Sequence, residues 1–237
     1  MVTATTFDGL LGGRVLLEQP VAGLRAAIDA VLLAAAVPAR VGDAVLELGC
    51  GTGVGLLCLA ARVPGLALHG VELDPVLVAL AQGNATRAGL HAAILQGDMR
   101  QPAPPVDHAF ANPPYWPGGT ASPIGLRRDA AHEGSARLAD WAAALVAPVR
   151  RRGSVSLILP AARLSEALAA LRGAGCGSIA VLPLWPRAGQ PARRVILRGI
   201  RGGRGPDRLL AGLVLHVGAG FTPAADTVLR DGHALIF

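Results

Sequence analysis

The segment Asn112-Pro113-Pro114-Tyr115 contains the residue types that methyl transfer onto a planar amine requires. Such an amine, on an adenine ring or a side-chain amide, is a poor nucleophile because its lone pair is delocalised. The side-chain oxygen of Asn112 and the carbonyl oxygen of Pro113 can accept hydrogen bonds from the amine and localise that lone pair, while the prolines hold both acceptors rigidly. Tyr115 offers an aromatic face on which an extruded base can stack. The plainer alternative is a proline-rich loop that ends a strand.

A glycine-rich turn lies upstream of this segment, in the run Glu47-Leu48-Gly49-Cys50-Gly51-Thr52-Gly53. A buried-strand pattern over residues 44–48 precedes the glycines and a helical pattern over 54–61 follows them. The three glycines allow positive φ and a close approach of the backbone to a ligand. The dinucleotide pattern G-x-G-x-x-G is not completed, because positions 54 and 56 are not glycine. The run predicts a nucleoside-binding turn or, more plainly, a glycine turn that begins a helix.

Three acidic residues follow the predicted strands. Glu72 ends a strand about twenty residues after the glycines, where an α/β nucleoside site places a carboxylate for the ribose hydroxyls. Asp74, followed by Pro75, is typical of a helix start. Asp98 comes directly after the strand pattern of residues 93–97, and it either faces an adenine amine or is a turn aspartate. The acids extend the candidate ligand site along the strand ends.

In their order, these motifs resemble those of S-adenosylmethionine-dependent methyltransferases of the small-domain class. Within that class the chain looks most like the bacterial tRNA adenine-N6 methyltransferases that modify valine tRNA beside the anticodon, and the resemblance extends to the opening and the tail of the chain. It implies S-adenosylmethionine as cofactor and a tRNA adenosine as substrate. The residues that it places in cofactor contact are Glu47, Gly49, Gly51, Gly53, Glu72, Asp98 and Asn112. Those that it places in amine recognition are Asn112, Pro113 and Tyr115, with Pro114 beside them in the substrate site.

Other activities stay open at this level. A protein-glutamine methyltransferase that modifies release factors faces the same problem with an amide nitrogen, but that family carries a helical domain where residues 1–43 precede the first strand here. DNA adenine methylation is weakened by the lack of a recognisable target-recognition insertion. A non-catalytic RNA-binding or cofactor-binding module is disfavoured by the intact Asn-Pro-Pro-Tyr segment, since the fold alone would not require those residues.

The pattern of elements predicts a single α/β, Rossmann-like domain with a mostly parallel, seven-stranded sheet. With 237 residues, 52% of them hydrophobic, the chain can bury a full core. Strands alternate with helical patterns from residue 44 to 173, and strands at 179–183 and 195–197 are expected to end the sheet as an antiparallel pair. Residues 44–237 form the predicted methyltransferase domain. Residues 1–43 form a lead and an amphipathic helix that we expect to pack on the cofactor site, with apolar residues at Leu24, Ile28, Leu32 and Ala35.

Positive charge is concentrated after the Asn-Pro-Pro-Tyr segment. The net charge is +6, and residues 127–208 carry fifteen arginines and five acidic residues, which gives +10 for that part. We expect ten of these arginines to form a face that follows a polynucleotide backbone. They are Arg127, Arg128, Arg150, Arg151, Arg152, Arg193, Arg194, Arg198, Arg201 and Arg204. The alternative is a compositional bias, because every basic residue is arginine, with residues 150–152 as a solvated turn.

Other classes of site are not indicated. Three cysteines without a C-x-x-C pair argue against a disulfide framework and a zinc site, and no metal is expected. Cys50 is best explained as a small residue that fills the glycine turn, because no activating histidine accompanies it. The apolar run 21–37 carries two charges and is too short to span a bilayer, and residues 1–8 lack the basic start of a signal peptide. We therefore expect a cytoplasmic monomer that binds RNA, with a substrate-contacting loop over residues 116–135.

Overall fold

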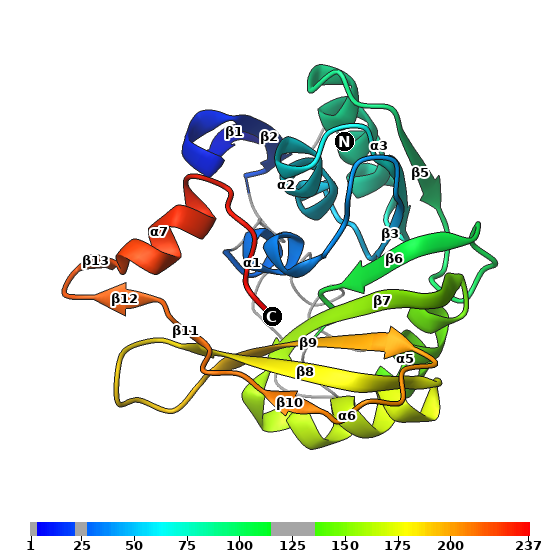
Figure 1. Ribbon diagram of the computed structural model, residues 1–237. Helices are drawn as coiled ribbons and strands as arrows, with labels where there is room; N and C mark the ends of the chain where they lie inside the picture. The colour runs from blue at the N-terminus through cyan, green and yellow to red at the C-terminus, as the bar shows by residue number, and fades with distance from the viewer. Residues whose placement is uncertain (1–3, 22–27, 115–135) are drawn as a thin grey trace.

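The computed structural model describes residues 4–21, 28–114 and 136–237 (Figure 1). Its centre is a sheet whose main strands lie in the order β8-β9-β7-β6-β3-β4-β5. These strands are β3 (Ala44–Leu48), β4 (Ala67–Glu72), β5 (Ala92–Gln96), β6 (Val106–Ala111), β7 (Val149–Pro160), β8 (Cys176–Trp185) and β9 (Arg194–Arg201). Strands β3 to β7 pair in parallel, while β9 runs antiparallel to both β7 and β8. The predicted sheet with its C-terminal antiparallel pair is confirmed.

Two short strands extend this sheet beyond the seven that the sequence predicted. Strands β10 (Arg208–Leu209) and β11 (Leu213–Val214) pair in parallel with the outer edge of β8. Each is only two residues long, too short to leave a hydrophobic pattern in the sequence. They cover part of the β8 edge, which would otherwise present unpaired backbone groups to solvent.

Helices cover both faces of the sheet (Figure 1). One face carries α1 (Ile28–Ala36), α2 (Val54–Arg62), α3 (Pro75–Arg87) and α7 (Pro223–Leu229). The other carries α5 (Leu138–Val146) and α6 (Leu164–Gly173), which follows the short 3-10 turn η2 (Ala161–Arg163). Successive residues of β3 enter the two cores in turn, because side chains alternate across a strand: Val45 lies in the first core and Leu46 in the second. This two-sided burial explains the continuous apolar run of the strand.

The helix start predicted at Asp74-Pro75 is confirmed, and the pair Thr222-Pro223 begins a second helix in the same way. The Asp74 carboxylate accepts a hydrogen bond from the backbone N–H of Val76 at 2.7 Å, with Pro75 in the first turn of α3. The Thr222 hydroxyl likewise accepts from the N–H of Ala225 at 3.1 Å at the start of α7. Each cap satisfies an N–H that has no partner within its helix.

The prediction that the helix after the N-terminal lead, α1, is amphipathic is wrong. All residues of α1 from Ala30 to Ala36 are buried, rather than one stripe of them. The helix contacts α2, α7 and the strands β6, β7 and β9, and the C-terminal segment returns over it, where the N–H of Leu235 donates to the carbonyl of Ala35. A helix that is covered on every side is apolar all round.

An N-terminal hairpin precedes α1. It consists of β1 (Thr5–Leu10) and β2 (Val15–Pro20), joined by a 3-10 turn, η1 (Leu11–Gly13). A second, smaller hairpin, β12 (His216–Val217) and β13 (Gly220–Phe221), lies just before α7. The division of the chain at residue 43 stays a prediction, although β3 does begin at Ala44. None of the described helices is long and apolar enough to cross a membrane.

Candidate active site

The glycine turn and the Asn112 segment lie side by side at one edge of the sheet. Leu48, the last residue of β3, pairs with Ala111, the last residue of β6. Gly49 and Asn112 therefore follow their strands at the same level of the sheet. The strand order reverses at this point, because β4 and β5 continue to one side of β3 while β6 and β7 lie on the other. Ligands of open α/β sheets bind at the carboxyl ends of the strands where this reversal occurs.

The glycine turn requires glycine at three positions. Gly49, Gly51 and Gly53 have φ values of 66°, 56° and 83°, in the left-handed region that disfavours other residues. The N–H groups of Gly49 and Cys50 both donate to the carbonyl of Val71 in β4, at 2.8 and 3.1 Å. The turn is thus fixed to the neighbouring strand, and the sequence prediction of positive φ is confirmed.

Cys50 and Trp141 pack around this turn. A Cβ on Gly49 would lie 3.1 Å from Cη2 of Trp141, a residue of α5 that is 9% exposed. The sulfur of Cys50 lies against Gly70 of β4, where there is no Cβ in its way. Burial raises the pKa of the Cys50 thiol well above its usual value, which is unsuited to a thiolate nucleophile. Cys50 therefore fills space in the turn, as the sequence indicated.

Glu47 is the buried acid of the site. It is 3% exposed, and its carboxylate accepts a hydrogen bond from the N–H of Leu56 in the first turn of α2 at 3.0 Å. A Cβ at position 55 would overlap this carboxylate, so Gly55 is the residue that gives it room. Burial raises the pKa of Glu47 well above its usual value, and the nearby charge of Glu72 raises it further.

Glu72 ends β4 and connects the strand end to the glycine turn. One carboxylate oxygen accepts from the N–H of Gly51 at 2.8 Å. The other accepts from the N–H groups of Leu73 and Asp74, at 2.8 and 3.0 Å. Glu72 therefore orients the turn, and it stands where the sequence predicted a carboxylate for ribose hydroxyls.

Asp98 lies at the end of β5 on the same edge, and its contacts favour the turn interpretation. Its carboxylate accepts from the backbone N–H of Arg100 at 2.9 Å and from the guanidinium of the same residue at 2.8 and 2.6 Å. These hydrogen bonds from Arg100 lower the pKa of Asp98 to about 2. The carboxylate is ionised at neutral pH, and a ligand that reaches it would share it with Arg100.

The structure describes three of the four residues in the predicted catalytic segment. Asn112 and Pro114 are partly buried and Pro113 is buried, directly after β6. Tyr115 lies outside the described residues, as do Arg127, Arg128 and the predicted substrate loop over 116–135. The acceptor groups of the amine hypothesis thus stand beside the glycine turn, while the stacking role of Tyr115 stays a prediction.

The arginines expected to form one face lie at opposite edges of the sheet. Arg151 is near the start of β7, and Arg201 ends β9 opposite Cys176, which begins β8. Both lie at the amino ends of the parallel strands. Arg194 instead pairs with Pro160, beyond the level of Ala111. Along the partner strand β6, the step from Val106, at the level of Val149, to Ala111 is roughly 17 Å at ~3.3 Å per residue. The expectation of a single face is therefore wrong.

Several of these arginines are also occupied by other groups. Arg150 forms an ion pair with Asp107 at 2.8 Å, and Arg194 forms one with Asp29 at 3.1 Å. Burial lowers the pKa of Arg198 to about 10, and its guanidinium donates to a backbone carbonyl at the end of α1. Charge that is already paired or buried contributes little to binding a polyanion.

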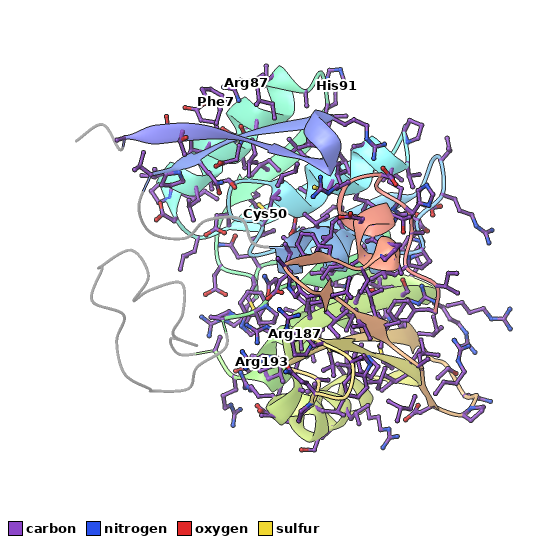
Figure 2. The ribbon with its side chains drawn as sticks, turned by 90° about the vertical axis from the view of Figure 1, so that its left-hand side faces the viewer. Phe7, Cys50, Arg87, His91, Arg187 and Arg193 are labelled. Carbon is purple, nitrogen blue, oxygen red and sulfur yellow. The ribbon has the colours of Figure 1, made fainter. Side chains whose placement is uncertain are left out.

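Arg193 and Arg187 both project at the carboxyl edge. Both belong to the loop between β8 and β9, which extends from the left-hand side of Figure 1; Figure 2 views that side and labels both residues. Arg193 is exposed, and Arg187 donates to the carbonyl of Gly218 at 2.8 Å, which holds the loop against the β12–β13 hairpin. Nothing in the sequence singles out Arg187, because only the strand ends place it at this edge.

The sequence also gave no signal for two other residues of the site. Trp141 was part of an apolar helical pattern, and its indole N–H is buried without a hydrogen-bond partner among the described residues. Asn84 is a fully buried polar residue of α3 that contacts the glycine turn. Across the described part of the chain, no group of three or more metal-ligating side chains comes together.

Comparison with known proteins identifies relatives of this arrangement. Residues 45–112 match the family model described as a methyltransferase domain. The chain is 31% identical to the tRNA1(Val) (adenine(37)-N6)-methyltransferase of Aeromonas hydrophila, over 76% of this chain and 78% of that protein. A predicted O-methyltransferase from Agrobacterium tumefaciens superposes with a TM-score of 0.71 at 25% identity, covering 88% of this chain and 98% of that one. The release factor glutamine methyltransferase of Geobacter sulfurreducens is 38% identical, but only over 31% of this chain and 27% of its own.

Proposed function

This chain belongs to the family of tRNA1(Val) (adenine(37)-N6)-methyltransferases, and on that basis we propose that it transfers a methyl group from S-adenosylmethionine to the N6 amine of an adenosine in tRNA. The observation that carries the proposal is the placement of Asn112 and Pro113 beside the glycine turn, where β3 and β6 end together. A tRNA substrate would also place the protein in the cytoplasm. Its expected monomeric state stays a prediction.

The residues at this edge fit the cofactor. When bound, S-adenosylmethionine supplies a methyl group activated by its sulfonium, and it also carries an ammonium group. Glu72 and Asp98 line the strand ends with acidic groups, which suit a cationic ligand, and the buried Glu47 lies beneath the turn. The left-handed glycines bring the backbone close without side chains in the way. Glu72 keeps acceptor capacity for hydroxyl groups, because one of its oxygens receives only the N–H of Gly51 among its described contacts.

Asn112 and Pro113 supply the catalysis in this proposal. The Asn112 side-chain oxygen and the Pro113 carbonyl oxygen accept hydrogen bonds from the two N–H groups of the target amine. The nitrogen becomes more positive as its bond to the methyl carbon forms, so these two hydrogen bonds strengthen in the transition state. In the direct transfer the nitrogen would take the methyl group as the S–CH3 bond breaks, which leaves S-adenosylhomocysteine, and the surplus proton of the amine would pass to solvent. No covalent enzyme intermediate is needed. The buried side chain of Pro113 keeps its carbonyl in place.

RNA is proposed to approach from the carboxyl edge, where Arg187 and Arg193 project. Of the substrate contacts predicted from the sequence, Arg193 fits this approach best because it is exposed at that edge. Arg194 stands at the same edge but already pairs with Asp29. Arg128 lies outside the described residues, and its contact with RNA stays a prediction. Phosphate contacts of this kind position the substrate without selecting its sequence.

Glutamine methylation of a release factor is the alternative that shares this chemistry. The match to the glutamine enzyme covers less than a third of either chain. The segment before β3 also weighs against it, because its described residues form a β-hairpin and the single helix α1 rather than a helical domain. The O-methyltransferase likeness supports the fold, but an Asn-Pro-Pro segment suits an amine acceptor better than a hydroxyl.

The test is a transfer assay with methyl-labelled S-adenosylmethionine. The purified protein is incubated with tRNA that lacks the modification and, in parallel, with a release factor, and the tRNA is digested to nucleosides for mass spectrometry. We expect labelled N6-methyladenosine and an unlabelled release factor. Asn112→Ala should lose turnover by about 10²–10³-fold while its affinity for S-adenosylhomocysteine changes little, because the lost interaction forms with the amine. Label in the release factor alone would refute the assignment.

A further inference from the structure

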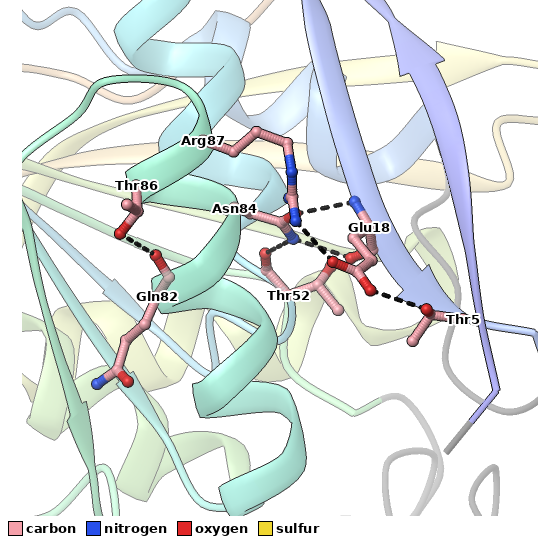
Figure 3. A network of polar contacts seen from close by, with 7 residues as sticks. All are labelled: Thr5, Glu18, Thr52, Gln82, Asn84, Thr86 and Arg87. Carbon is pink, nitrogen blue, oxygen red and sulfur yellow. Dashed lines mark hydrogen bonds and ion pairs between the residues drawn. The ribbon is translucent and has the colours of Figure 1, made fainter. Parts of the chain in front are cut away.

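Asn84 in α3 uses every hydrogen-bonding position of its side chain. Its Nδ2 donates to the carbonyl oxygens of Glu18 at 2.8 Å and Thr52 at 3.0 Å. Its Oδ1 accepts from the backbone N–H of Glu18 and from Nη1 of Arg87, both at 2.8 Å. A carboxamide has two donor hydrogens and two acceptor lone pairs, so all four are occupied. Figure 3 shows Asn84 between the hairpin strand that carries Glu18 and the turn that carries Thr52.

The two hydrogen bonds to the backbone of Glu18 attach the N-terminal hairpin to α3. Asn84 bonds both the N–H and the C=O of Glu18, as a neighbouring strand would, and thereby covers the edge of β2 that does not face β1. Arg87 adds an ion pair to the Glu18 carboxylate at 2.7 Å, and its guanidinium lies 4.9 Å from the ring centre of Phe7 in β1. The hairpin is therefore held by two residues of α3, Asn84 and Arg87.

The remaining partner, Thr52, belongs to the glycine turn itself. It lies between Gly51 and Gly53, both with positive φ, in a segment that is flexible by residue type. Glu72 holds the N–H of Gly51 from the β4 side, and Asn84 holds the carbonyl of Thr52, one residue further, from the α3 side. The turn is thus clamped between two side chains that approach from different elements. A loop held in its bound conformation binds its ligand with a smaller loss of entropy.

We propose that Asn84 is a positioning residue that fixes the glycine turn and couples it to the β1–β2 hairpin, so that docking of the hairpin and binding of the cofactor favour each other. This inference rests on the proposed function for the identity of the cofactor. Coupling between two events is reciprocal. Cofactor bound at the glycine turn fixes Thr52, and through Thr52 it fixes Asn84 and the hairpin. Conversely, a docked hairpin keeps Asn84 oriented toward Thr52.

The experiment measures affinity for S-adenosylhomocysteine by calorimetry, and amide hydrogen exchange in the hairpin with and without that ligand. Asn84→Ala should weaken binding about tenfold or more, the loss expected when one buried hydrogen bond no longer holds the turn. In the wild type, saturating ligand should slow exchange of the Glu18 N–H, which opens with the hairpin. Asn84→Ala should abolish that effect of the ligand on the rest of the hairpin.

Two variants separate this coupling from general destabilisation. Thr86→Ala lies in the same helix, where its hydroxyl bonds only the carbonyl of Gln82 among its described contacts, and binding should stay within about twofold of wild type. Arg87→Ala loosens the hairpin without touching Thr52, so it should affect affinity less than Asn84→Ala. Asn84→Asp, which keeps the acceptor oxygen and loses the donors to the Thr52 and Glu18 carbonyls, replaces the alanine variant if that one does not fold.

The outcomes distinguish this inference from the proposed function. A wild type that does not bind S-adenosylhomocysteine would refute the cofactor assignment and this coupling with it. A wild type that binds, together with Asn84 variants that unfold more easily but bind as tightly, would leave the cofactor assignment standing and reduce Asn84 to a structural role. Unchanged exchange of the Glu18 N–H at saturating ligand would overturn the coupling without use of any variant.

Discussion

Replacing Gly49 with alanine tests whether the glycine turn is shaped both by its backbone conformation and by Trp141. Two costs are expected. The left-handed conformation, with φ of 66°, disfavours any residue with a Cβ by about 1–2 kcal/mol, partly offset by about 0.4–1 kcal/mol from the lower entropy of the unfolded chain. The new Cβ would also lie 3.1 Å from Cη2 of Trp141, and crowding of a packed site costs about 1–3 kcal/mol.

Gly89→Ala is the matched control for this substitution. Gly89 lies two residues after the end of α3 with a φ of 67°, almost the same as Gly49, but no atom outside its chain neighbours lies within 4 Å of a Cβ placed there. We expect about 1 kcal/mol of destabilisation for Gly89→Ala and about 2–4 kcal/mol for Gly49→Ala. At about 2–4 °C per kcal/mol for a chain of this size, the Tm should fall by about 2–4 °C and about 5–15 °C, respectively.

The measurements are urea unfolding for the free energy of unfolding and calorimetry for binding of S-adenosylhomocysteine. Gly89→Ala should leave affinity unchanged, whereas Gly49→Ala should lower it because the turn is displaced. In a Trp141→Leu background, which removes the crowding atoms, the stability cost of Gly49→Ala should fall to that of Gly89→Ala. Equal costs for Gly49→Ala and Gly89→Ala in the wild-type background would refute the contact with Trp141 as a determinant of the turn.

Three further predictions concern other parts of the fold. Arg193→Ala should weaken tRNA binding and reduce its salt slope by about 1, while Arg151→Ala, an equal change of charge at the opposite edge, should do neither in a filter-binding titration. Arg62→Met should lower the free energy of unfolding by about 1–3 kcal/mol in urea titrations, because the Arg62 guanidinium donates to two carbonyl groups at the end of α1, at 3.0 and 2.6 Å. Burial lowers the pKa of His108 below 6.5, although Asp43 opposes this shift. Protonation of His108 therefore favours the unfolded state, and the free energy of unfolding should fall as pH drops below about 6.5. His108→Asn should flatten that decline in unfolding titrations between about pH 7.5 and 5.

Local chemistry made several features predictable from the sequence alone. The Asp74 and Thr222 caps and the left-handed glycines depend on residues within one turn of each other, so their types and spacing suffice to identify them. The strand that ends at Ala111 was found in the same way, from its apolar run and the prolines that stop it. These features located the site along the chain and indicated its chemistry.

Tertiary structure decided which of these features meet. Strands β3 and β6 are neighbours although about sixty residues separate their ends, and only the reversal of strand order brings Gly49 beside Asn112. Arginines of the same basic part of the sequence were separated, because a strand carries the chain from one edge of the sheet to the other: Arg151 and Arg193 stand at opposite edges. Asn84 gave no sequence signal, since its four partners come from β2, the glycine turn and its own helix. Residue types thus determined the chemistry that this chain can carry out, whereas the pairing of distant strands decided where it is carried out and which side chains support it.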